Sequence, residues 1–399
     1  MNRHSQSAFI VSQESLMTNR GNRHPAFALT LSSLGFNVEY LTTNYNHAEK
    51  KKFTPQEITD FVKLVPYKAK VFSMTAYPKN ICFRRLFGNI KTASLMAFYI
   101  LKNCRRNDII IVNSQPPEFI LIAALAKKLR RNKLIVDVRD VWPDGLPLTN
   151  RFTHKLFRAY CLKICSIAMK EADYCIYTAS GFLQWLKRYV KHNNIDFIPL
   201  GFDKNRWTNY RPLRSQDINQ TIKFAYIGDI NKSAKIEPLI HSIAGSSRYS
   251  LTFIGKGDSL DVIKKLSEKL NAQNIHFTGF LPKEKVAEEI QNFHVTVIPL
   301  KIKYAMPNKL FDSIASFRPI LVFGQNDTAE FVKNHDIGWN LPFDIKKIKS
   351  FLHSLNKENI AAKSQNIAKI RNEFSEQFLY AKAVRKILEL SKNHLPDKN

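Results

Sequence analysis

The sequence is poor in the features that mark secreted, membrane-spanning and zinc-binding proteins. Its 399 residues include five cysteines, which form no Cys-x-x-Cys pair and suit a reducing cytosol. The N-terminal residues MNRHSQSAFIVS lack the apolar run of a signal peptide. No stretch reaches the roughly 18 uninterrupted apolar residues that a membrane-spanning helix needs. These absences predict a cytoplasmic protein that is soluble or peripheral at the inner face of the plasma membrane.

Acidic residues are also scarce. The chain has 33 Asp and Glu against 61 Lys and Arg, which gives a formal net charge of +28. Such an excess suits an anionic partner, whether nucleic acid, nucleotide phosphate or an anionic membrane surface. A nucleic-acid-binding protein would also need basic and aromatic side chains interleaved on one surface, or a recognition helix, and the sequence shows neither. We therefore expect no nucleic-acid partner.

Short apolar runs alternate along the chain with segments of helical periodicity. This alternation predicts the α/β class with parallel, doubly wound sheets. It stops at the polar stretch 206–221, which we interpret as a linker, and then resumes. We expect two Rossmann-like domains that face each other across a cleft: residues 1–205 with a C-terminal helix at 375–399, and residues 206–374. The expected strands are 7–12, 37–43, 70–75, 108–113, 133–138 and 173–178 in the first domain, and 222–229, 249–257, 274–279, 294–300 and 319–324 in the second.

One stretch of the second half, MPNKLFDS (306–313), predicts an anion-binding turn. It follows a strand and opens a helix, where Pro307 suits the entry and Asn308 the N-cap. The N–H groups of the first turn and Lys309 would hold a phosphate by hydrogen bonds, dipole and charge. Asp312, about one turn further on, could accept both hydroxyls of a ribose. The alternative is a capped core helix with a surface Lys–Asp pair.

Two further strand ends in this half offer glycine or lysine where a helix begins. AYIGDINKSAKIEPLI (225–240) carries one glycine and two lysines, and FIGKGDSL (253–260) carries a Gly-x-Gly. Glycine lets backbone approach a ligand closely, although a plain tight turn explains a lone Gly-x-Gly equally well. The predicted donor-binding residues are Gly228, Lys232, Lys235, Gly255, Gly257, Phe280, Pro307, Asn308, Lys309 and Asp312.

In the first half, LIVDVRDVWPDGLP (134–147) places charges against a Trp-Pro turn at the end of a strand. Charges packed there are costly unless they are paired. One interpretation is an Arg–Asp pair that pins the loop. The other is that Asp140 or Asp144 faces the cleft and binds sugar hydroxyls or transfers a proton, with Arg139 beside them on the acceptor side.

Two other candidates follow strands of the first half. The loop RGNRH (20–24) belongs to a turn without Gly-x-Gly-x-x-Gly, which disfavours a dinucleotide site. Arg20, Gly21 and Arg23 could instead meet an acceptor phosphate, or they form a solvated surface loop. His47 follows the second expected strand. A lone histidine is more often structural than catalytic, but its expected place near the cleft makes it a candidate.

The segment 79–106 has an apolar middle flanked by cations, and its periodicity predicts an apolar helical face. We expect either a core helix with a solvated basic edge or a surface helix that contacts anionic lipid. The predicted apolar face consists of Leu86, Ile90, Ala93, Ala97 and Ile100.

With these residues placed, nearly the whole chain resembles the retaining glycosyltransferases of family 4, which have the GT-B fold. The resemblance is to their bacterial branch that assembles capsule and O-antigen polysaccharides. IVDVRDVWPDG resembles that branch's Asp-x-Arg-Asp-x-Trp-Pro-Glu/Asp segment, and RGNRHPAFALTLSSLGFNVEYLTTNYNH resembles its N-terminal motif. IPLGFD resembles the domain-closing motif, and PNKLFDSIASFRPIL the nucleotide helix. The chain departs from the family pattern at Leu200, Tyr304, Asp312 and Phe317; Tyr304 and Asp312 stand where the family has paired glutamates.

The resemblance implies transfer of a sugar, with retention, from a nucleotide sugar to a lipid-linked saccharide acceptor. A UDP-linked HexNAc or a related donor is expected. The second domain would hold the donor, and the first the acceptor. Lys309 and Lys235 would offset the charge on the departing diphosphate, so we expect neither a metal nor a cofactor. Three alternatives stay open: an epimerase or hydrolase of the same fold that turns over the UDP-sugar alone, a nucleic-acid-binding protein, and a catalytically inactive scaffold at the membrane.

Overall fold

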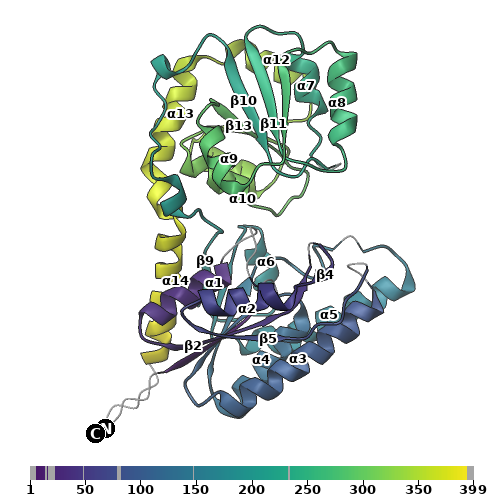
Figure 1. Cartoon of the computed structure of the whole chain (residues 1–399), viewed down its shortest axis with the longest axis vertical. Helices are drawn as coiled ribbons and strands as arrows, with labels where there is room; N and C mark the ends of the chain where they lie inside the picture. Colours follow the sequence, from purple (N-terminus) through teal and green to yellow (C-terminus); the bar gives the residue numbers. More distant parts are fainter. Residues whose placement is uncertain are drawn as a thin grey trace. The chain divides into compact units, whose positions relative to one another are not determined.

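The chain forms two compact units. The computed structural model describes residues 6–13, 16, 23–47, 49–78, 82–146, 148–231 and 234–392. The first unit is Met1–Ile198 with Tyr380–Asn399, and the second is Pro199–Leu379. Each unit contains a parallel sheet with helices packed on it, which confirms the predicted α/β class with two Rossmann-like units (Figure 1).

The first unit is built on a seven-stranded sheet and a two-stranded hairpin. The sheet contains β1 (Ser7–Val11), β2 (Asn37–Thr43), β5 (Lys68–Phe72), β6 (Ile109–Asn113), β7 (Lys133–Val138), β8 (Tyr174–Tyr177) and β9 (Ile195–Phe197), and the hairpin pairs β3 (Tyr45–Asn46) with β4 (Lys51–Lys52). The strand order is β5-β2-β1-β6-β7-β8-β9, and the strands are parallel. Every residue of β6 and β7 is buried, as expected for parallel strands that are covered on both faces.

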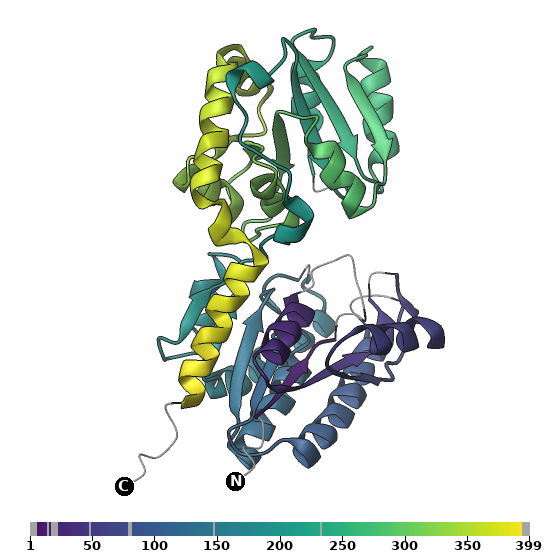
Figure 2. The ribbon, with the colours of Figure 1, turned by 60° about the vertical axis from the view of Figure 1, so that its left-hand side comes forward.

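Helices cover both faces of this sheet. They are α1 (Arg23–Ser33), α2 (Pro55–Leu64), α3 (Phe83–Asn103), α4 (Pro117–Arg130), α5 (Phe152–Ala168) and α6 (Phe182–Leu186), with a 3-10 turn η1 (Met169–Glu171). From β1 the chain adds β2 and β5 toward one edge of the sheet, and it then returns to the other side of β1 and adds β6 to β9 toward the opposite edge. Right-handed crossovers therefore place α1 and α2 on one face and α3, α4 and α5 on the other (Figure 1). The last helix, α14 (Glu376–Lys392), lies beside α1, where the ring centroids of Tyr380 and Phe27 are 5.0 Å apart (Figure 2).

Helix α3 packs on the sheet through a face that is rotated from the predicted one. Ala93 and Ile100 are buried as expected, but Ile90 is 40% exposed. Small residues let the helix come close to the segment after β5, because a Cβ added at Gly88 would lie only 3.1 Å from Thr75 Cβ. The buried residues of the helix are Gly88, Asn89, Thr92, Ala93, Met96 and Ile100.

The second unit is built on a six-stranded parallel sheet. Its strands are β10 (Ile222–Ile227), β11 (Tyr249–Ile254), β12 (Ile275–Gly279), β13 (Val295–Pro299), β14 (Ile320–Phe323) and β15 (Gly338–Leu341), in the order β12-β11-β10-β13-β14-β15. Its helices are α7 (Glu237–Ile243), α8 (Leu260–Lys269), α9 (Lys283–Ile290), α10 (Asn308–Ala315), α11 (Asp327–Asn334), α12 (Ile345–Ser354) and α13 (Lys357–Ile370), with 3-10 turns η2 (Lys204–Trp207), η3 (Ser215–Asp217) and η4 (Arg371–Phe374). The core between sheet and helices includes Phe224, Phe253 and Val295, all fully buried.

The stretch 206–221 is not the linker that we predicted. Trp207 is buried, and Leu213 and Ile218 belong to the core of the second unit. The backbone amide of Leu213 donates a hydrogen bond of 2.8 Å to the hydroxyl of Ser364. The prediction was wrong because buried residues in irregular backbone leave no periodicity in the sequence.

Candidate active site

The turn between β13 and α10 opens the predicted anion site at the C-terminal edge of the second sheet. Helix α10 begins at Asn308, and its N-cap is Pro307, which has no side-chain hydrogen bond to offer. The prediction that Asn308 is the N-cap is therefore wrong by one position. The carbonyl of Pro307 accepts the N–H of Leu310 at 3.0 Å, but proline has no side chain that could accept from the N–H groups of Asn308 and Lys309, and an anion is a suitable partner for them.

Lys309 extends from this turn toward the end of β10. Its Nζ lies 4.4 Å from the centroid of the Tyr226 ring. Gly228 has φ +122°, and a Cβ added there would be 3.7 Å from Lys309 Nζ. Burial lowers the pKa of Lys309 to about 8, although the charge of Asp229 acts to raise it. A poorly solvated cation beside a position without a side chain is well placed to bind a phosphate group.

Two further cations, Lys235 and Lys301, lie at the same sheet edge. Lys235 precedes α7 with φ +33°, in the left-handed region. A side-chain hydrogen bond with Lys235 is the main cause that lowers the pKa of Lys301, in the segment after β13. Two lysines this close repel each other when both are charged, so a bound anion would stabilise both. Lys232, which the sequence placed beside Lys235, lies outside the described residues.

The glycines of the Gly-x-Gly turn are required by packing between two loops. A Cβ added at Gly255 would lie 1.9 Å from the carbonyl oxygen of Gly228, and one at Gly257 would lie 2.3 Å from that of Ile230. The amide of Ile230 also donates a 2.9 Å hydrogen bond to the carbonyl of Lys256. The loops after β10 and β11 thus lie directly against each other, and the tight-turn interpretation of this motif is the one that the structure favours.

Phe280 lies just beyond the end of β12. Its side chain is 61% exposed, and Lys256 Nζ is 4.9 Å from the centroid of its ring. An exposed ring next to a cation offers a surface on which a nucleobase could stack.

Asp312 belongs to a cluster of charges that the sequence did not reveal. Burial raises the pKa of Asp312 to about 6, against the charges of Lys283 and Arg206, which lower it. Burial also raises the pKa of Glu376 to about 7. These groups come from η2, α9, α10 and α14, so no local pattern connects them. Asp312 is half-buried, with two cations near it to hold it in place.

In the first unit, Arg23 is an internal residue. Its side chain has no exposed surface, and its Nε is 2.8 Å from Asp137 Oδ2. His24 Nε2 is 3.1 Å from the same oxygen. Burial by itself would raise the pKa of Asp137, but Arg23 and then His24 lower it to about 2. The structure therefore contradicts the expected acceptor-side role of Arg23; Arg20 and Gly21 of the same loop lie outside the described residues.

The Trp-Pro turn is pinned by ion pairs. Asp144 Oδ1 is 2.6 Å from Arg158, and its Oδ2 is 2.8 Å from Arg188. The structural interpretation of Asp144 is thus favoured, although its partners are Arg158 on α5 and Arg188 just after α6, and not Arg139. Asp140, four residues earlier, is exposed at the end of β7 and can reach a ligand.

His47 is held by its neighbours near the end of β2. Its Nδ1 contacts the hydroxyl of Tyr77, and its Nε2 is 3.2 Å from the carbonyl oxygen of Gln13. The ring of Tyr45 lies edge-on to that of His47, with centroids 5.1 Å apart. The histidine is half-buried and oriented, as a residue that positions or protonates a substrate needs to be.

Beneath His47 runs a buried polar network that the sequence analysis missed. Gln13 Nε2 donates to Asn89 Oδ1 at 2.7 Å. Glu118 accepts from Asn89 at 3.5 Å and from the hydroxyl of Tyr160 at 3.0 Å, and burial raises its pKa. An acid inside the apolar run PEFILIAAL was the one signal of this network in the sequence. The network fixes the chain just after β1.

The comparisons with known proteins agree with this geometry. Residues 221–356 match the family described as glycosyl transferases group 1. The chain is 20% identical over 287 residues to the probable glycosyltransferase WbjE of Pseudomonas aeruginosa, which covers 66% of this chain and 70% of WbjE. HepE of Anabaena, solved with UDP-glucose, superposes with a TM-score of 0.67 at 11% identity, over 96% of this chain and 100% of that one. WaaG, a glycosyltransferase involved in lipopolysaccharide biosynthesis, superposes with a TM-score of 0.65 at 13% identity, over 95% and 99%.

These findings define the class of the protein. The chain has the GT-B architecture, and residues 221–356 of its second unit are similar to the glycosyl transferases of group 1. The matched range contains the turn with Lys309, the loop with Gly228 and the exposed Phe280. Among the described residues, no group of three or more His, Cys, Asp or Glu side chains is placed to hold a metal ion.

Proposed function

We propose that the protein transfers a sugar, with retention, from a UDP-sugar such as a UDP-HexNAc to a lipid-linked saccharide acceptor. The observation that carries this proposal is the desolvated Lys309 beside Gly228, at the start of a helix whose N-cap is a proline. The crystal structure of HepE with UDP-glucose supports a nucleotide-sugar donor on this fold.

The second unit binds the donor in this proposal. The first-turn N–H groups of α10 and Lys309 hold the diphosphate, and Lys235 with Lys301 adds charge at the same sheet edge. When the bond between the sugar and the diphosphate breaks, negative charge grows on the leaving UDP. Fixed cations stabilise that charge without reorganisation, which is the role that a metal has in other transferases.

Asp312 and Phe280 bind the nucleoside in this proposal. The carboxylate of Asp312 accepts hydrogen bonds from the ribose hydroxyls, and Lys283 with Arg206 keeps it ionised while the donor is bound. The ring of Phe280 stacks on the base. Tyr304, at the position of the family's first glutamate, is 37% exposed and offers its hydroxyl to the donor sugar.

The first unit binds the acceptor in this proposal. His47 and Asp140 lie at the C-terminal edge of its sheet, and both are accessible there. They orient the acceptor hydroxyl and receive its proton, while Asp144 keeps the Trp-Pro turn in place through Arg158 and Arg188. The resemblance to WaaG supports an acceptor of the surface-polysaccharide type.

The first test is thermal unfolding with UDP, GDP or ADP, each in EDTA and in magnesium. A ligand at a hundredfold excess over its Kd stabilises the folded state by about 2.7 kcal/mol. We expect stabilisation by UDP in EDTA, and its loss in Lys309→Met, which keeps the packing on Tyr226 and removes the charge. Lys264→Met, on the exposed surface of α8, is the matched control and should respond like the wild type.

Two results would count against the proposal. If no nucleotide stabilises the protein, the turn is only the start of a core helix and the donor site is wrong. If UDP binds but a UDP-sugar is consumed equally fast without any acceptor, the protein is an epimerase or hydrolase of the same fold.

A further inference from the structure

One helical face of the first unit exposes much apolar surface. Helices α3, α4 and α5 carry more than half of the large exposed apolar side chains among the described residues. On α3, Phe83, Phe87 and Phe98 are 63%, 67% and 73% exposed, and their spacing with Ile90 puts them on one side of the helix, away from its buried face. The others are Leu95 on α3, Leu121, Leu125 and Leu129 on α4, and Phe152, Leu156 and Ile167 on α5.

These side chains form one surface, here called the α3–α5 face. Helix α4 packs against α3 on one side and against α5 on the other, and all three cover the same side of the sheet (Figure 1). In the second unit the exposed apolar residues are spread over different elements, such as Val262 on α8 and Ile345 on α12, with Ile302 and Tyr304 together in the segment after β13. Single exposed residues need no explanation, but an apolar surface that extends over three helices marks an interaction site.

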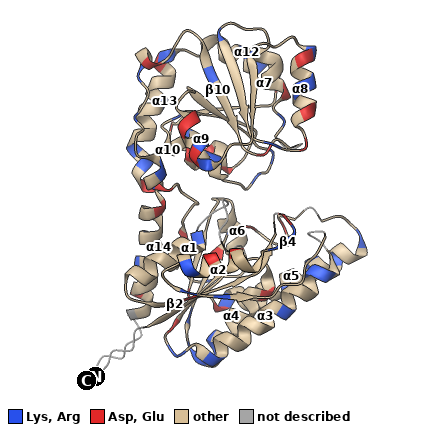
Figure 3. Cartoon of the chain, viewed as in Figure 1, with Lys and Arg blue, Asp and Glu red and all other residues tan. Residues whose placement is uncertain are grey.

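Cations outnumber acids on the α3–α5 face. The one acidic residue of the three helices, Glu118, is buried, and the cations of α4 lie in its last turn. Three cations pair with acids outside the helices: Lys127 with Asp173, Lys128 with Glu171 and Arg158 with Asp144. On α3, the exposed Arg84, Lys91 and Lys102 flank the phenylalanine stripe on one side. Figure 3 shows blue segments along α3 and α5. The partner therefore combines an apolar phase with negative charge.

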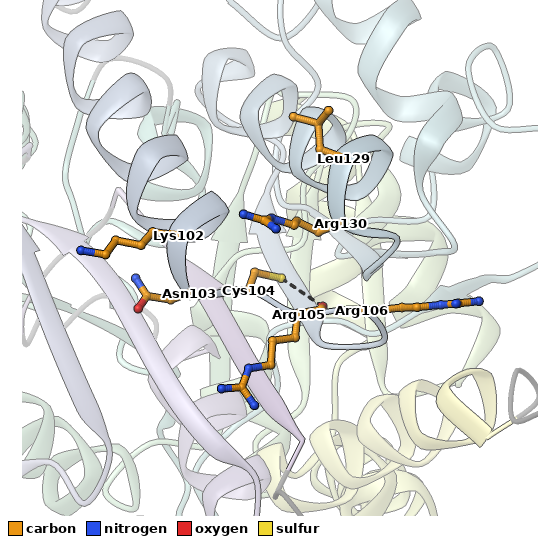
Figure 4. Close-up of a pocket in the computed structure, with 7 residues that line it drawn as sticks. All are labelled: Lys102, Asn103, Cys104, Arg105, Arg106, Leu129 and Arg130. Carbon is orange, nitrogen blue, oxygen red and sulfur yellow. Dashed lines mark hydrogen bonds between the residues drawn. The ribbon is translucent and has the colours of Figure 1, made fainter.

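A basic depression lies at the end of this face, where α3 and α4 both terminate. It measures about 490 Å³ and is lined by Lys102, Arg105, Arg106 and Arg130, with the exposed Leu129 beside them. In Figure 4, Arg130 and Arg105 lie above and below Cys104. Cations grouped next to an exposed leucine suit a ligand in which a phosphate group is joined to an apolar part.

We propose that the α3–α5 face docks on a bilayer that contains anionic phospholipid. The phenylalanines and leucines enter the headgroup and acyl boundary, and the cations of the depression bind lipid phosphates. A second copy of the chain would set cations against cations across a two-fold axis, which is unfavourable. A nucleic acid would leave the phenylalanines without an apolar partner. Within the described ranges, no helix is long and apolar enough to cross a membrane, so the proposed contact is interfacial.

The test is co-sedimentation of the full chain with vesicles of equal parts phosphatidylcholine and phosphatidylglycerol. Phe87→Ser/Phe98→Ser removes two apolar contacts, and we expect it to lower the partition coefficient by about tenfold or more. Arg105→Gln/Arg106→Gln should lower it by about tenfold and reduce its dependence on salt. Vesicles of phosphatidylcholine alone should bind the wild type much more weakly.

Control variants sit on α8, in the other unit. Val262→Ser removes an apolar side chain that is 62% exposed, and Lys264→Gln/Lys265→Gln removes two exposed cations. Both should bind vesicles like the wild type. Because all substituted side chains are exposed, the melting temperatures should stay unchanged, which separates lost docking from lost folding. The assay needs neither nucleotide nor acceptor, so its outcome is independent of the transferase proposal.

Three outcomes would overturn the proposal. The first is a wild-type chain that does not bind the anionic vesicles. The second is binding that both α3–α5 variants retain in full. The third is a dimer in sedimentation velocity that Phe87→Ser/Phe98→Ser dissolves while vesicle binding is absent, because a second copy would then cover this face.

Discussion

Replacing Arg23 with methionine should destabilise the first unit by about 3 to 5 kcal/mol at neutral pH, because it leaves a buried carboxylate without its main partner. Arg23 and Asp137 are both fully buried, with Nε and Oδ2 2.8 Å apart. The methionine retains most of the stem that packs near Phe27 and Tyr380. His24 and the charge of Arg139 remain, and they offset only part of the loss.

The pKa of Asp137 determines how the cost of Arg23→Met changes with pH. The folded state lowers the pKa of Asp137 to about 2, against about 3.9 in an unfolded chain. A shift of nearly two units stabilises the folded protein by about 2.6 kcal/mol above pH 4, and this contribution is lost as the pH falls from about 4 to about 2. Without Arg23 the pKa of Asp137 rises. The cost of the substitution should therefore be largest near pH 7 and shrink as the carboxylate becomes protonated.

Hydrogen exchange measured by mass spectrometry can resolve this effect in a chain with two units. Peptides from β6 and β7 report the stability of the first unit, and peptides from β13 in the second serve as an internal control. Arg188→Met is the matched variant, since its partner Asp144 is 2.8 Å away but Arg188 is 60% exposed. An exposed ion pair contributes about 0 to 1 kcal/mol. The reasoning is refuted if Arg23→Met costs no more than Arg188→Met, or if its cost does not change between pH 7 and pH 4.

Two further predictions concern the second unit. Lys309 has its pKa lowered to about 8, so UDP affinity should fall by up to about tenfold per unit above that pH; a titration by calorimetry should show no such decline in Lys309→Met. Gly255→Ala would place a Cβ 1.9 Å from the carbonyl oxygen of Gly228 and should destabilise the second unit by about 3 kcal/mol or more. Gly245→Ala, where nothing lies within 4 Å but φ is +73°, should cost only the strain of about 1 kcal/mol, and equal melting temperatures for the two variants would contradict the collision argument.

Periodicity along the chain was enough to find the fold class, because both units depend on strands that are buried on both faces. β6 and β13 are fully buried and consist almost wholly of apolar residues, which is typical of strands inside a parallel sheet. The edge strands β9 and β15 were missed, since they are short and half-exposed and carry mixed side chains. The sequence also predicted that Lys309 lies in the first turn of a helix that follows a strand, because this position depends on neighbouring residues alone.

Periodicity could not predict which side chains are buried or which distant segments pair. The sequence shows Arg23 as a cation in a polar loop, and only the fold brings it to Asp137, which is 114 positions away. Glycine in a Gly-x-Gly turn looks the same whether a ligand or another loop lies against it, and here the loop after β10 lies there. The periodicity of α3 indicated an apolar face, but its rotation follows from the close approach at Gly88. Local patterns identify elements because propensity and period are properties of neighbouring residues, whereas a side chain's surroundings depend on which elements the sheet order places beside it.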